Sequence, residues 1–430
     1  MSSSQIGTFA RAVASLACGL DAALDALARM IAIDTSFPPG DGYGMFADLL
    51  ERLLAPLGLD CRKIVVPREL WDGGDGCAKG ERINLVAERR TGKPVCGLYF
   101  HIDTVPPAPD WSRPPFALTH EGQRLYGLGA ADMKGSMAAV LLALSAARAS
   151  GVALAYDPML LFCTDEEGGL YPGIRYLAEQ GHLEGHILSF NGTAAPRIWA
   201  GCFGSINLII RVHGRAAHAG DAAGVNALEA ALPVMNELVA LKARVARRRS
   251  ALRPPPGAGP LAARLTIAAA HGGVSGGAVP SRFDILVNRR YAPEESFEEV
   301  VDEIRHTVEA SLVESKARLE IRLAGHLAPV TDPTGPHWPR WQAALSKGFG
   351  WKPEEFRSWG ATSSSDFGWV QRAGRQEILL GGLGRPQRNV HAAEEHTTVE
   401  DVVALATSVL SYLSAEFRPD IIPETARSVS

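Results

Sequence analysis

The chain has 430 residues, more than one hydrophobic core usually supports, so we expect two domains. Hydrophobic residues make up 46% and charged residues 21% of the sequence, values that argue against global disorder. The formal net charge of −4 argues against a general polyanion binder, and six cysteines without a CxxC pair do not form a disulfide scaffold at this length. A reducing compartment is therefore the expected location.

The segment Met1–Ile33 is predicted to be an amphipathic helix rather than a signal peptide, because charged residues interrupt it at helical spacing. The longest uncharged run, Leu265–Ser281, contains four glycines and a proline, which a membrane span would not favour. We therefore expect a soluble, cytoplasmic protein that does not contact a membrane.

The part of the chain before residue 200 alternates short apolar runs with helical patterns. This alternation is typical of an α/β sheet covered by helices on both faces. The predicted strands are 83–87, 96–102 and 158–163, and the predicted helices are 136–149 and 174–180.

From residue 206 the order of predicted elements becomes βαββαβ, which is typical of a ferredoxin-like domain. The strands are 206–212, 261–268, 283–288 and 319–323, and the helices are 226–248 and 296–313. A predicted strand at 377–380 and a predicted helix at 398–417 then return to the strand–helix alternation of the first 200 residues. The simplest interpretation is an α/β domain of residues 1–205 and 325–430, interrupted by an inserted domain of residues 206–324.

The arginine-rich stretch Lys242–Pro260 could be a nucleic-acid patch or a solvated helix end that runs into a loop. No aromatic residues are interleaved with these charges, so we favour the helix end and expect no nucleic-acid partner.

Four short motifs place chemically active side chains next to predicted strand ends, where α/β sheets build their sites. His101 and Asp103 lie at the end of the predicted strand 96–102, and Asp132 lies in a glycine-rich segment before a helix. Each alone also fits a structural role, a turn for the first pair and a helix N-cap for Asp132.

The remaining two motifs are an acidic run and a late histidine. Three consecutive acids at 165–167 follow a buried strand and repel one another unless a cation or protons neutralise them, although a solvated turn is the alternative. His391 follows a glycine-rich loop. Together the four motifs supply two imidazoles and several carboxylates, a set that suits manganese, zinc or cobalt better than copper.

In this order and over nearly the whole chain, the motifs resemble the M20 family of metallohydrolases, which includes aminoacylases, carboxypeptidase G-like enzymes and succinyl-diaminopimelate desuccinylases. The resemblance implies a mixed-sheet catalytic domain that is interrupted by a ferredoxin-like lid and dimerisation domain. The matching segments are His101-x-Asp103, Gly129-x-x-Asp132-x-Lys134-Gly135, Glu166-Glu167, His218 within 214–220, and His391 followed by Glu395.

The resemblance also implies the metal ligands. His101 is expected to bind one metal, and Asp132 to bridge two. Glu167 and His391 are expected to bind the other metal. The family's further acidic ligand is replaced here by Asn191, whose neutral carbonyl oxygen is a weaker partner for a divalent cation. We therefore expect one tightly held ion per chain.

Three further roles follow from the resemblance. Glu166 is expected to be the general base that takes a proton from the activated water. Asp103 is expected to orient His101, since ligating imidazoles generally need such a partner. His218 is expected to reach the active site of a neighbouring subunit, which implies at least a dimer formed through the lid.

The positions that face substrate in the family also differ in this chain. The acidic residues usual in the lid and in a late loop are replaced by Asn288 and Ser364, whereas Arg290 remains. Arg290 or Arg388 could hold a substrate carboxylate, because guanidinium groups match carboxylates in shape. The joint changes suggest a substrate other than a common acyl amino acid or peptide.

The leading hypothesis is therefore a metal-dependent C–N hydrolase. The chain resembles a branch of the family that removes the aromatic amine of 5-nitroanthranilate hydrolytically, giving 5-nitrosalicylate and ammonia. The alternative within the class is an N-acyl-amino-acid deacylase or dipeptidase. A non-catalytic binding protein of the same fold is the alternative from another class, although the retained Glu166 argues against it.

Overall fold

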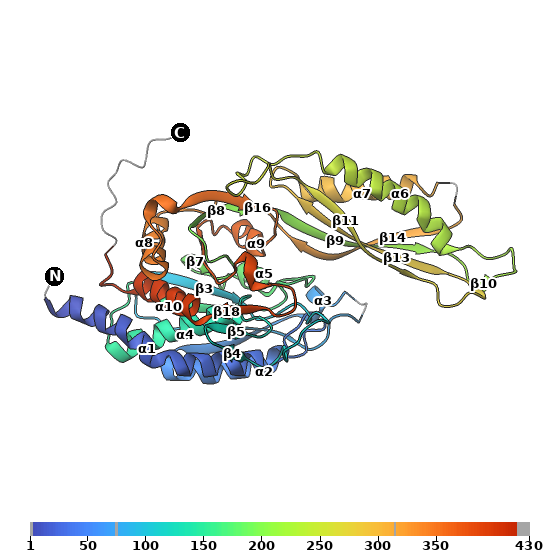
Figure 1. Cartoon of the computed structure of the whole chain (residues 1–430). Helices are drawn as coiled ribbons and strands as arrows, with labels where there is room; N and C mark the ends of the chain where they lie inside the picture. The colour runs from blue at the N-terminus through green and yellow to red at the C-terminus, as the bar shows by residue number, and fades with distance from the viewer. Residues whose placement is uncertain (1–2, 74–75, 314, 419–430) are drawn as a thin grey trace. The chain divides into compact units, whose positions relative to one another are not determined.

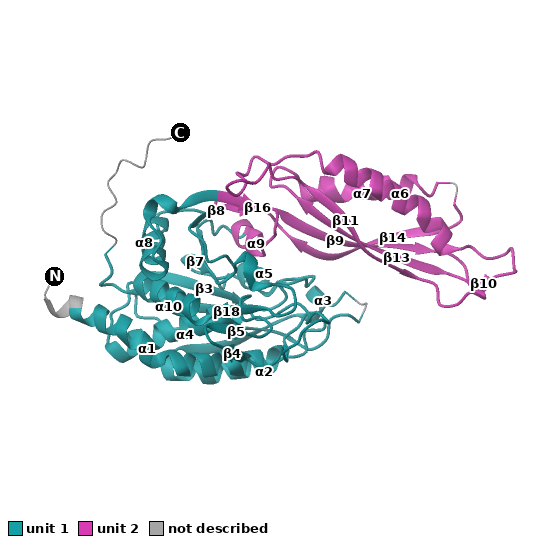
Figure 2. Ribbon diagram, in the orientation of Figure 1, with its two compact units in different colours: residues 1–199, 333–358, 373–430 teal, residues 200–332, 359–372 magenta. Residues whose placement is uncertain are grey.

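The computed structural model describes residues 3–73, 76–313 and 315–418, and the chain divides into two compact units (Figures 1 and 2). Unit 1 comprises the residues up to 199, residues 333–358 and the residues from 373 onward. Unit 2 comprises residues 200–332 and 359–372. The chain thus leaves unit 1 twice. The first insertion, residues 200–332, is longer at both ends than the predicted inserted domain of residues 206–324.

The second insertion, residues 359–372, was expected in the α/β domain. It belongs to unit 2 because the Phe203 amide donates to the Ala361 carbonyl at 3.1 Å and because helix α9 (Phe367–Arg372) packs on strands of that unit. A segment this short has no hydrophobic periodicity of its own, so only tertiary contacts show to which unit it belongs.

Unit 1 is built around a mixed six-stranded sheet in the order β1-β2-β6-β3-β7-β17. Strands β1, β2 and β6 are antiparallel neighbours, and β6, β3, β7 and β17 are parallel neighbours. All seven residues of β6 are buried, as expected for a central strand covered on both faces. The bounds are β1 Asp60–Val66, β2 Arg82–Glu88, β3 Val95–His101, β6 Asp157–Cys163, β7 His186–Ser189 and β17 Ile378–Leu380.

The central helix of unit 1 is α4 (Lys134–Ser150), which is rich in alanine and leucine and ends at Gly151 in the left-handed conformation. Helices α1 and α10 both pack on α4, and α8 packs on α10. No helix among the described residues is long and apolar enough to cross a membrane. The other helices are α1 Ser3–Ile31, α2 Tyr43–Leu54, α3 Arg68–Trp71, α5 Gly173–Glu179, α8 Trp338–Phe349 and α10 Val399–Leu413, with 3₁₀ turns at Ala55–Leu57, Pro353–Glu355 and Pro386–Arg388.

Unit 2 contains a four-stranded antiparallel sheet in the order β11-β13-β9-β14, with helices α6 and α7 packed against each other (Figure 2). Alternate residues of β9 and β13 are buried, which is the period-2 pattern of a sheet with one face on a core. Helix α6 begins after Asn226, whose side chain caps the Leu228 and Glu229 amides. The bounds are β9 Gly204–His213, α6 Ala227–Val245, β11 Arg264–Gly272, β13 Arg282–Tyr291, α7 Phe297–Ala310 and β14 Arg318–Leu327.

This strand order, with the observed βαββαβ sequence of elements, is the ferredoxin-like arrangement expected from the sequence. Three small sheets complete the fold. They are formed by β18 (His396–Thr398), β5 (Arg124–Tyr126) and β4 (Thr119–Glu121), by β15 (Val330–Thr331), β8 (Arg197–Cys202) and β16 (Arg357–Ala361), and by β10 (Ala217–His218) and β12 (Ala278–Val279).

Candidate metal centre

The parallel register of the central strands brings two of the predicted motifs together. His101 at the end of β3 is paired with Cys163 at the end of β6. Asp103 and Glu167, a few residues beyond, therefore leave the sheet at the same edge, and the Glu167 amide donates to the Asp103 carboxylate at 2.8 Å. This edge is where α/β sheets generally form their sites.

Three side chains at this edge can offer ligand atoms to one ion. The nearest ligand atoms of His101, Asp132 and Glu167 all lie within 4.8 Å of one another. His391 joins them, because its Nε2 lies 3.0 Å from Glu167 Oε1 and 3.5 Å from Asp132 Oδ2. The structure thus brings together the four residues predicted to be the main metal ligands.

His101 is oriented for binding through Nε2. Its Nδ1 is 2.9 Å from the backbone carbonyl of Asp103, so this nitrogen donates its proton there and Nε2 faces Asp132 at 3.2 Å. The sequence predicted that the Asp103 carboxylate would hold His101. Its Oδ1 is 3.8 Å from Nδ1, so the carbonyl holds the ring, and the carboxylate instead fixes the backbone at Glu167.

Glu395 positions the loop that carries Asp132. This side chain is 2% exposed, and its two oxygens accept hydrogen bonds of 2.9 Å from the amides of Gly129, Ala131 and Asp132. Burial raises the pKa of Glu395 to about 7 in spite of these donors. Glu395 matched the family motif in the sequence, but its role as the support of a ligand loop appears only in three dimensions.

The electrostatics of the centre favour positive charge. Hydrogen bonds to Asp132 and Glu167 raise the pKa of His391 to about 11. Burial opposes protonation of His101, yet its hydrogen bond to Asp132 and the surrounding carboxylates raise its pKa well above the ordinary value. Both shifts are caused by the neighbouring carboxylates, and a divalent cation held here would take the place of the imidazole protons. The donor set of two imidazoles and two carboxylates fits such an ion.

Asn191 contacts the predicted general base. Its amide Nδ2 donates to Glu166 Oε1 at 2.9 Å, and the Glu166 side chain is largely buried. The residue predicted to be a weak ligand therefore holds the residue predicted to be the general base.

The first acid of the run, Asp165, is turned away from the ligands. It forms an ion pair of 2.8 Å with the fully buried Arg82 and accepts a hydrogen bond of 2.9 Å from Tyr43. Arg82 also lies over the rings of Phe37, Tyr43 and Trp71. Sequence reasoning missed Arg82, because nothing in its local pattern distinguishes it from a surface arginine at a strand start.

Three predicted substrate-binding residues form one cluster in unit 2. The Arg290 guanidinium donates to Asn288 Oδ1 at 3.2 Å and to the Ser364 hydroxyl. Asn288 in turn donates to Asn207 at 2.7 Å and to Ser205 at 3.0 Å. The cluster therefore presents a guanidinium supported by neutral polar groups, where the family pattern has acids.

Arg388 is placed differently from the prediction. It is 7% exposed, and its guanidinium forms a 2.6 Å ion pair with Asp401, which also pairs with Arg385. A guanidinium engaged in this way supports the start of α10, so the structure does not favour a substrate-binding role for Arg388. His218, at the end of β10, is exposed and accepts a hydrogen bond of 3.1 Å from the Gly220 amide.

Comparison with known proteins shows the family to which the chain belongs. The family model Peptidase family M20/M25/M40 matches residues 97–415. A succinyl-diaminopimelate desuccinylase of Xanthomonas campestris pv. campestris is 30% identical over 385 residues, covering 85% of this chain and 96% of the relative. A dipeptidase structure from Saccharomyces cerevisiae superimposes with a TM-score of 0.79 at 15% identity, covering 94% of this chain and 97% of that one.

The fold and the site thus define a class of protein, a mixed-sheet hydrolase with a centre of carboxylates and imidazoles at one edge of its sheet. The chain belongs to peptidase family M20/M25/M40, and it is a metal-dependent hydrolase that acts on C–N bonds. The family uses divalent metal ions, and a Bacillus subtilis member (TM-score 0.55, 15% identity, covering 91% of this chain and 97% of that one) is described as a dinuclear metal-binding peptidase.

Replacement of Arg82 by methionine should destabilise the fold strongly, because Asp165 would be left buried and unpaired. Removing one partner of a buried ion pair typically costs about 3–5 kcal/mol. The double variant Arg82→Met/Asp165→Asn should recover part of this loss. Urea unfolding of both variants measures the difference, and equal stability of the single and double variants would contradict the account.

His391→Ala should weaken binding of Mn²⁺ or Zn²⁺ by at least tenfold, because it removes a nitrogen that faces both Glu167 and Asp132. Isothermal titration of metal-free protein measures the affinity. His120→Ala is the matched control, since His120 is exposed and bonds only the Gly122 carbonyl among the contacts seen. Unchanged affinity in His391→Ala would remove this residue from the ligand set.

Proposed function

We propose that this protein hydrolyses the amide bond of a small N-acyl amino acid or dipeptide with water that a bound divalent ion activates. The observation that carries the proposal is the convergence of His101, Asp132, Glu167 and His391 beside the largely buried Glu166. The similarity to a desuccinylase, which by its name removes a succinyl group from an amine, supports an amide substrate. Manganese, zinc or cobalt suits the mixed nitrogen and oxygen ligands.

The chain's own residues define the proton path. A divalent ion held by these ligands supplies Lewis acidity, which lowers the pKa of water and polarises a carbonyl group. Glu166 accepts the proton of the attacking water at a carboxylate oxygen and delivers it to the departing nitrogen. Asn191 donates to Glu166 Oε1 and so restrains this carboxylate. The Arg290 guanidinium is the group proposed to bind a substrate carboxylate.

A second candidate is hydrolytic removal of the amine of 5-nitroanthranilate, giving 5-nitrosalicylate and ammonia. The observation that favours it is the set of neutral side chains at positions where the family pattern has acids, with Asn191 beside Glu166 and with Asn288 and Ser364 beside Arg290. The nitro group para to the amine can accept the charge that develops when water adds to the ring carbon. His218 is proposed to hydrogen-bond the nitro oxygens in that reaction.

A substrate panel decides between the two. Metal-loaded protein is incubated with N-succinyl and N-acetyl amino acids, with simple dipeptides, and with 5-nitroanthranilate. Release of acyl acid or amino acid from the first groups, with the nitroaryl amine untouched, supports amide hydrolysis. Ammonia release from 5-nitroanthranilate alone would replace the amide proposal by the second candidate, and metal-independent turnover of any substrate would contradict both.

Glu166→Gln should lower kcat by about 10²–10⁴-fold while metal binding is retained, because the amide cannot accept the proton. Steady-state kinetics and a parallel metal titration measure the two effects. Glu184→Gln, at an exposed glutamate that pairs with Arg90, provides the control. A variant with near-native kcat would assign the base to another carboxylate.

We propose one tightly held ion per chain, because the Asn191 side chain lacks the charge of the family's acidic ligand. Elemental analysis of dialysed native protein should give about one ion per chain. Asn191→Asp should raise the stoichiometry, since the introduced carboxylate lies beside Glu166 and the two acids need a cation between them. Two tightly held ions in the native protein would contradict this prediction.

We also propose that the chain forms at least a dimer through unit 2 and that His218 acts in the site of a neighbouring subunit. Mixed dimers of His218→Ala and Glu166→Gln chains should then regain part of the activity that each variant lacks, because one site receives both native residues. Activity of differently tagged, co-purified mixed dimers measures this. Absence of complementation in such dimers would place His218 outside the neighbouring site.

A further inference from the structure

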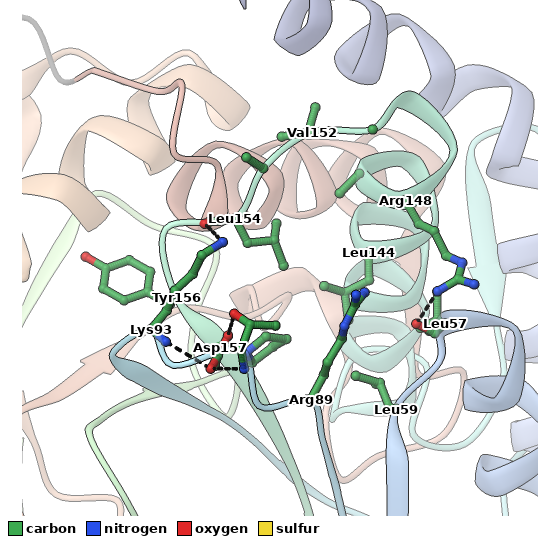
Figure 3. A pocket seen from close by; sticks show the side chains of 15 residues that line it. Leu57, Leu59, Arg89, Lys93, Leu144, Arg148, Val152, Leu154, Tyr156 and Asp157 are labelled. Atoms are coloured by element: carbon green, nitrogen blue, oxygen red, sulfur yellow. Dashed lines mark hydrogen bonds between the residues drawn. The ribbon is translucent and has the colours of Figure 1, made fainter.

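Unit 1 contains a cavity, drawn in Figure 3. It lies at the opposite end of strand β6 from the metal ligands. Asp157 and Pro158, which begin β6, line this cavity, whereas the end of β6 leads to Glu166 and Glu167. Its volume is about 320 Å³, which falls in the range of about 300–1,000 Å³ that is typical of small-molecule sites. Neither the family resemblance nor the proposed reaction uses this cavity.

The walls of the cavity are mainly apolar. They come from the turn after α2, from the last turns of α4 and from the loop that follows α4. The apolar side chains that line it are Leu57, Leu59, Leu144, Ala147, Val152, Ala153 and Leu154. Such walls favour a hydrocarbon body, because its burial removes apolar surface from water.

Three cationic side chains line the same cavity (Figure 3). Lys93 donates to the Leu154 carbonyl at 2.7 Å, and Arg148 donates to the Leu57 carbonyl at 2.8 Å. Arg89 follows the end of β2, and it forms no ion pair or hydrogen bond with any residue that the structure describes. No carboxylate of the described residues neutralises these three charges.

The carboxylate that lines the cavity, Asp157, is held by hydrogen bonds from residues 91–93. Asp157 accepts hydrogen bonds from the Thr91 amide and hydroxyl, both at 2.6 Å, and from the amides of Gly92 and Lys93 at 3.1 and 3.2 Å. With its side chain 3% exposed and both oxygens engaged, Asp157 shapes the 91–93 turn. The cavity therefore offers an excess of positive charge beside an apolar wall.

We propose that this cavity is a binding site for a small amphipathic carboxylate. The hydrocarbon body packs on the leucine and valine walls, and the carboxylate pairs with the Arg89 guanidinium, whose fork matches carboxylate geometry. Apart from the cations, the polar side chains that line the cavity are Thr91, Tyr156 and Asp157, and the first and last of these bond to each other. This small set disfavours a sugar or a nucleoside, and the three cations disfavour an amine. Alkyl and aryl carboxylates share this chemistry, and the test separates them.

Isothermal titration of metal-loaded protein with sodium octanoate and with sodium benzoate tests the proposal. Along the series octanoate, hexanoate and butanoate, affinity should fall about fourfold for each methylene removed, because each methylene is buried against the walls. Octanol and octylammonium should bind more weakly than octanoate. Tighter binding of benzoate than of hexanoate would assign the site to aryl rather than alkyl carboxylates.

The matched pair Arg89→Gln and Arg90→Gln locates the bound ligand. Arg89→Gln should weaken octanoate binding by about 10–100-fold, because a charge-assisted hydrogen bond is lost. Arg90→Gln should leave it unchanged, since Arg90 pairs with Glu88 and Glu184 and does not line the cavity. Ala153→Trp, at an exposed lining position, should also block binding by filling the cavity.

Three results would overturn the proposal. They are no octanoate binding at millimolar concentration, equal affinities of Arg89→Gln and native protein, and affinity that does not depend on chain length. Carboxylate binding at the metal centre would give the second and third results together. The metal-dependent activity proposed above is a separate measurement, so failure of either proposal leaves the other standing.

Discussion

The concentration of negative charge at the ends of β3 and β6 is the constraint on which the rest of unit 1 depends. Asp132 and Glu167 lie within hydrogen-bonding distance of the same imidazole, and further acids surround them at Asp103, Asp165 and Glu166. Such a group is stable only when opposite charge or hydrogen-bond donors compensate each carboxylate. The surrounding structure supplies separate partners to Asp103, Asp165 and Glu166, whereas Asp132 and Glu167 share His391.

Some of these carboxylates are neutralised or stabilised by groups of the protein itself, and others keep a negative charge that a metal ion can use. Arg82 neutralises Asp165, the backbone amides at 129–132 stabilise Glu395, and the Glu167 amide stabilises Asp103. Among the residues that the structure describes, the cationic partners of Asp132 and Glu167 are imidazoles, whose protons a divalent ion can displace. The permanent partners therefore hold the loops in place, and the remaining negative charge is directed to a metal.

Loop 389–396 shows how much support this requires. Asn389, His391 and Glu394 all adopt left-handed backbone conformations, which are costly for residues other than glycine. Glu394 fixes the loop to the Ser112 amide and hydroxyl and to Arg113, while the neighbouring Glu395 fixes it to the loop that carries Asp132. The strain is sustained because two separate segments of unit 1 hold the loop from either side.

The amino-acid sequence by itself determined most of the elements and indicated the residues that the structure brings together at the candidate metal centre. Apolar periodicity predicted the strands β3 and β6, the helix α4 and the βαββαβ order of unit 2, because burial on a sheet or helix face leaves a regular pattern. The motifs at His101, Asp132, Glu166–Glu167 and His391 were visible because they are local and follow strand ends.

Only the tertiary structure decided how those residues are used. In the structure Asp165 pairs with Arg82, Asn191 bonds Glu166, and Arg388 pairs with Asp401. His101 is oriented by a backbone carbonyl and not by the predicted carboxylate. The tertiary structure also joined residues 359–372 to unit 2 and collected Arg89, Lys93 and Arg148 around one apolar cavity. These pairings link residues up to 83 positions apart in the chain, as for Arg82 and Asp165. The residues next to a charged side chain in the sequence do not reveal its partner. The pairing depends on the distances and the burial that folding creates.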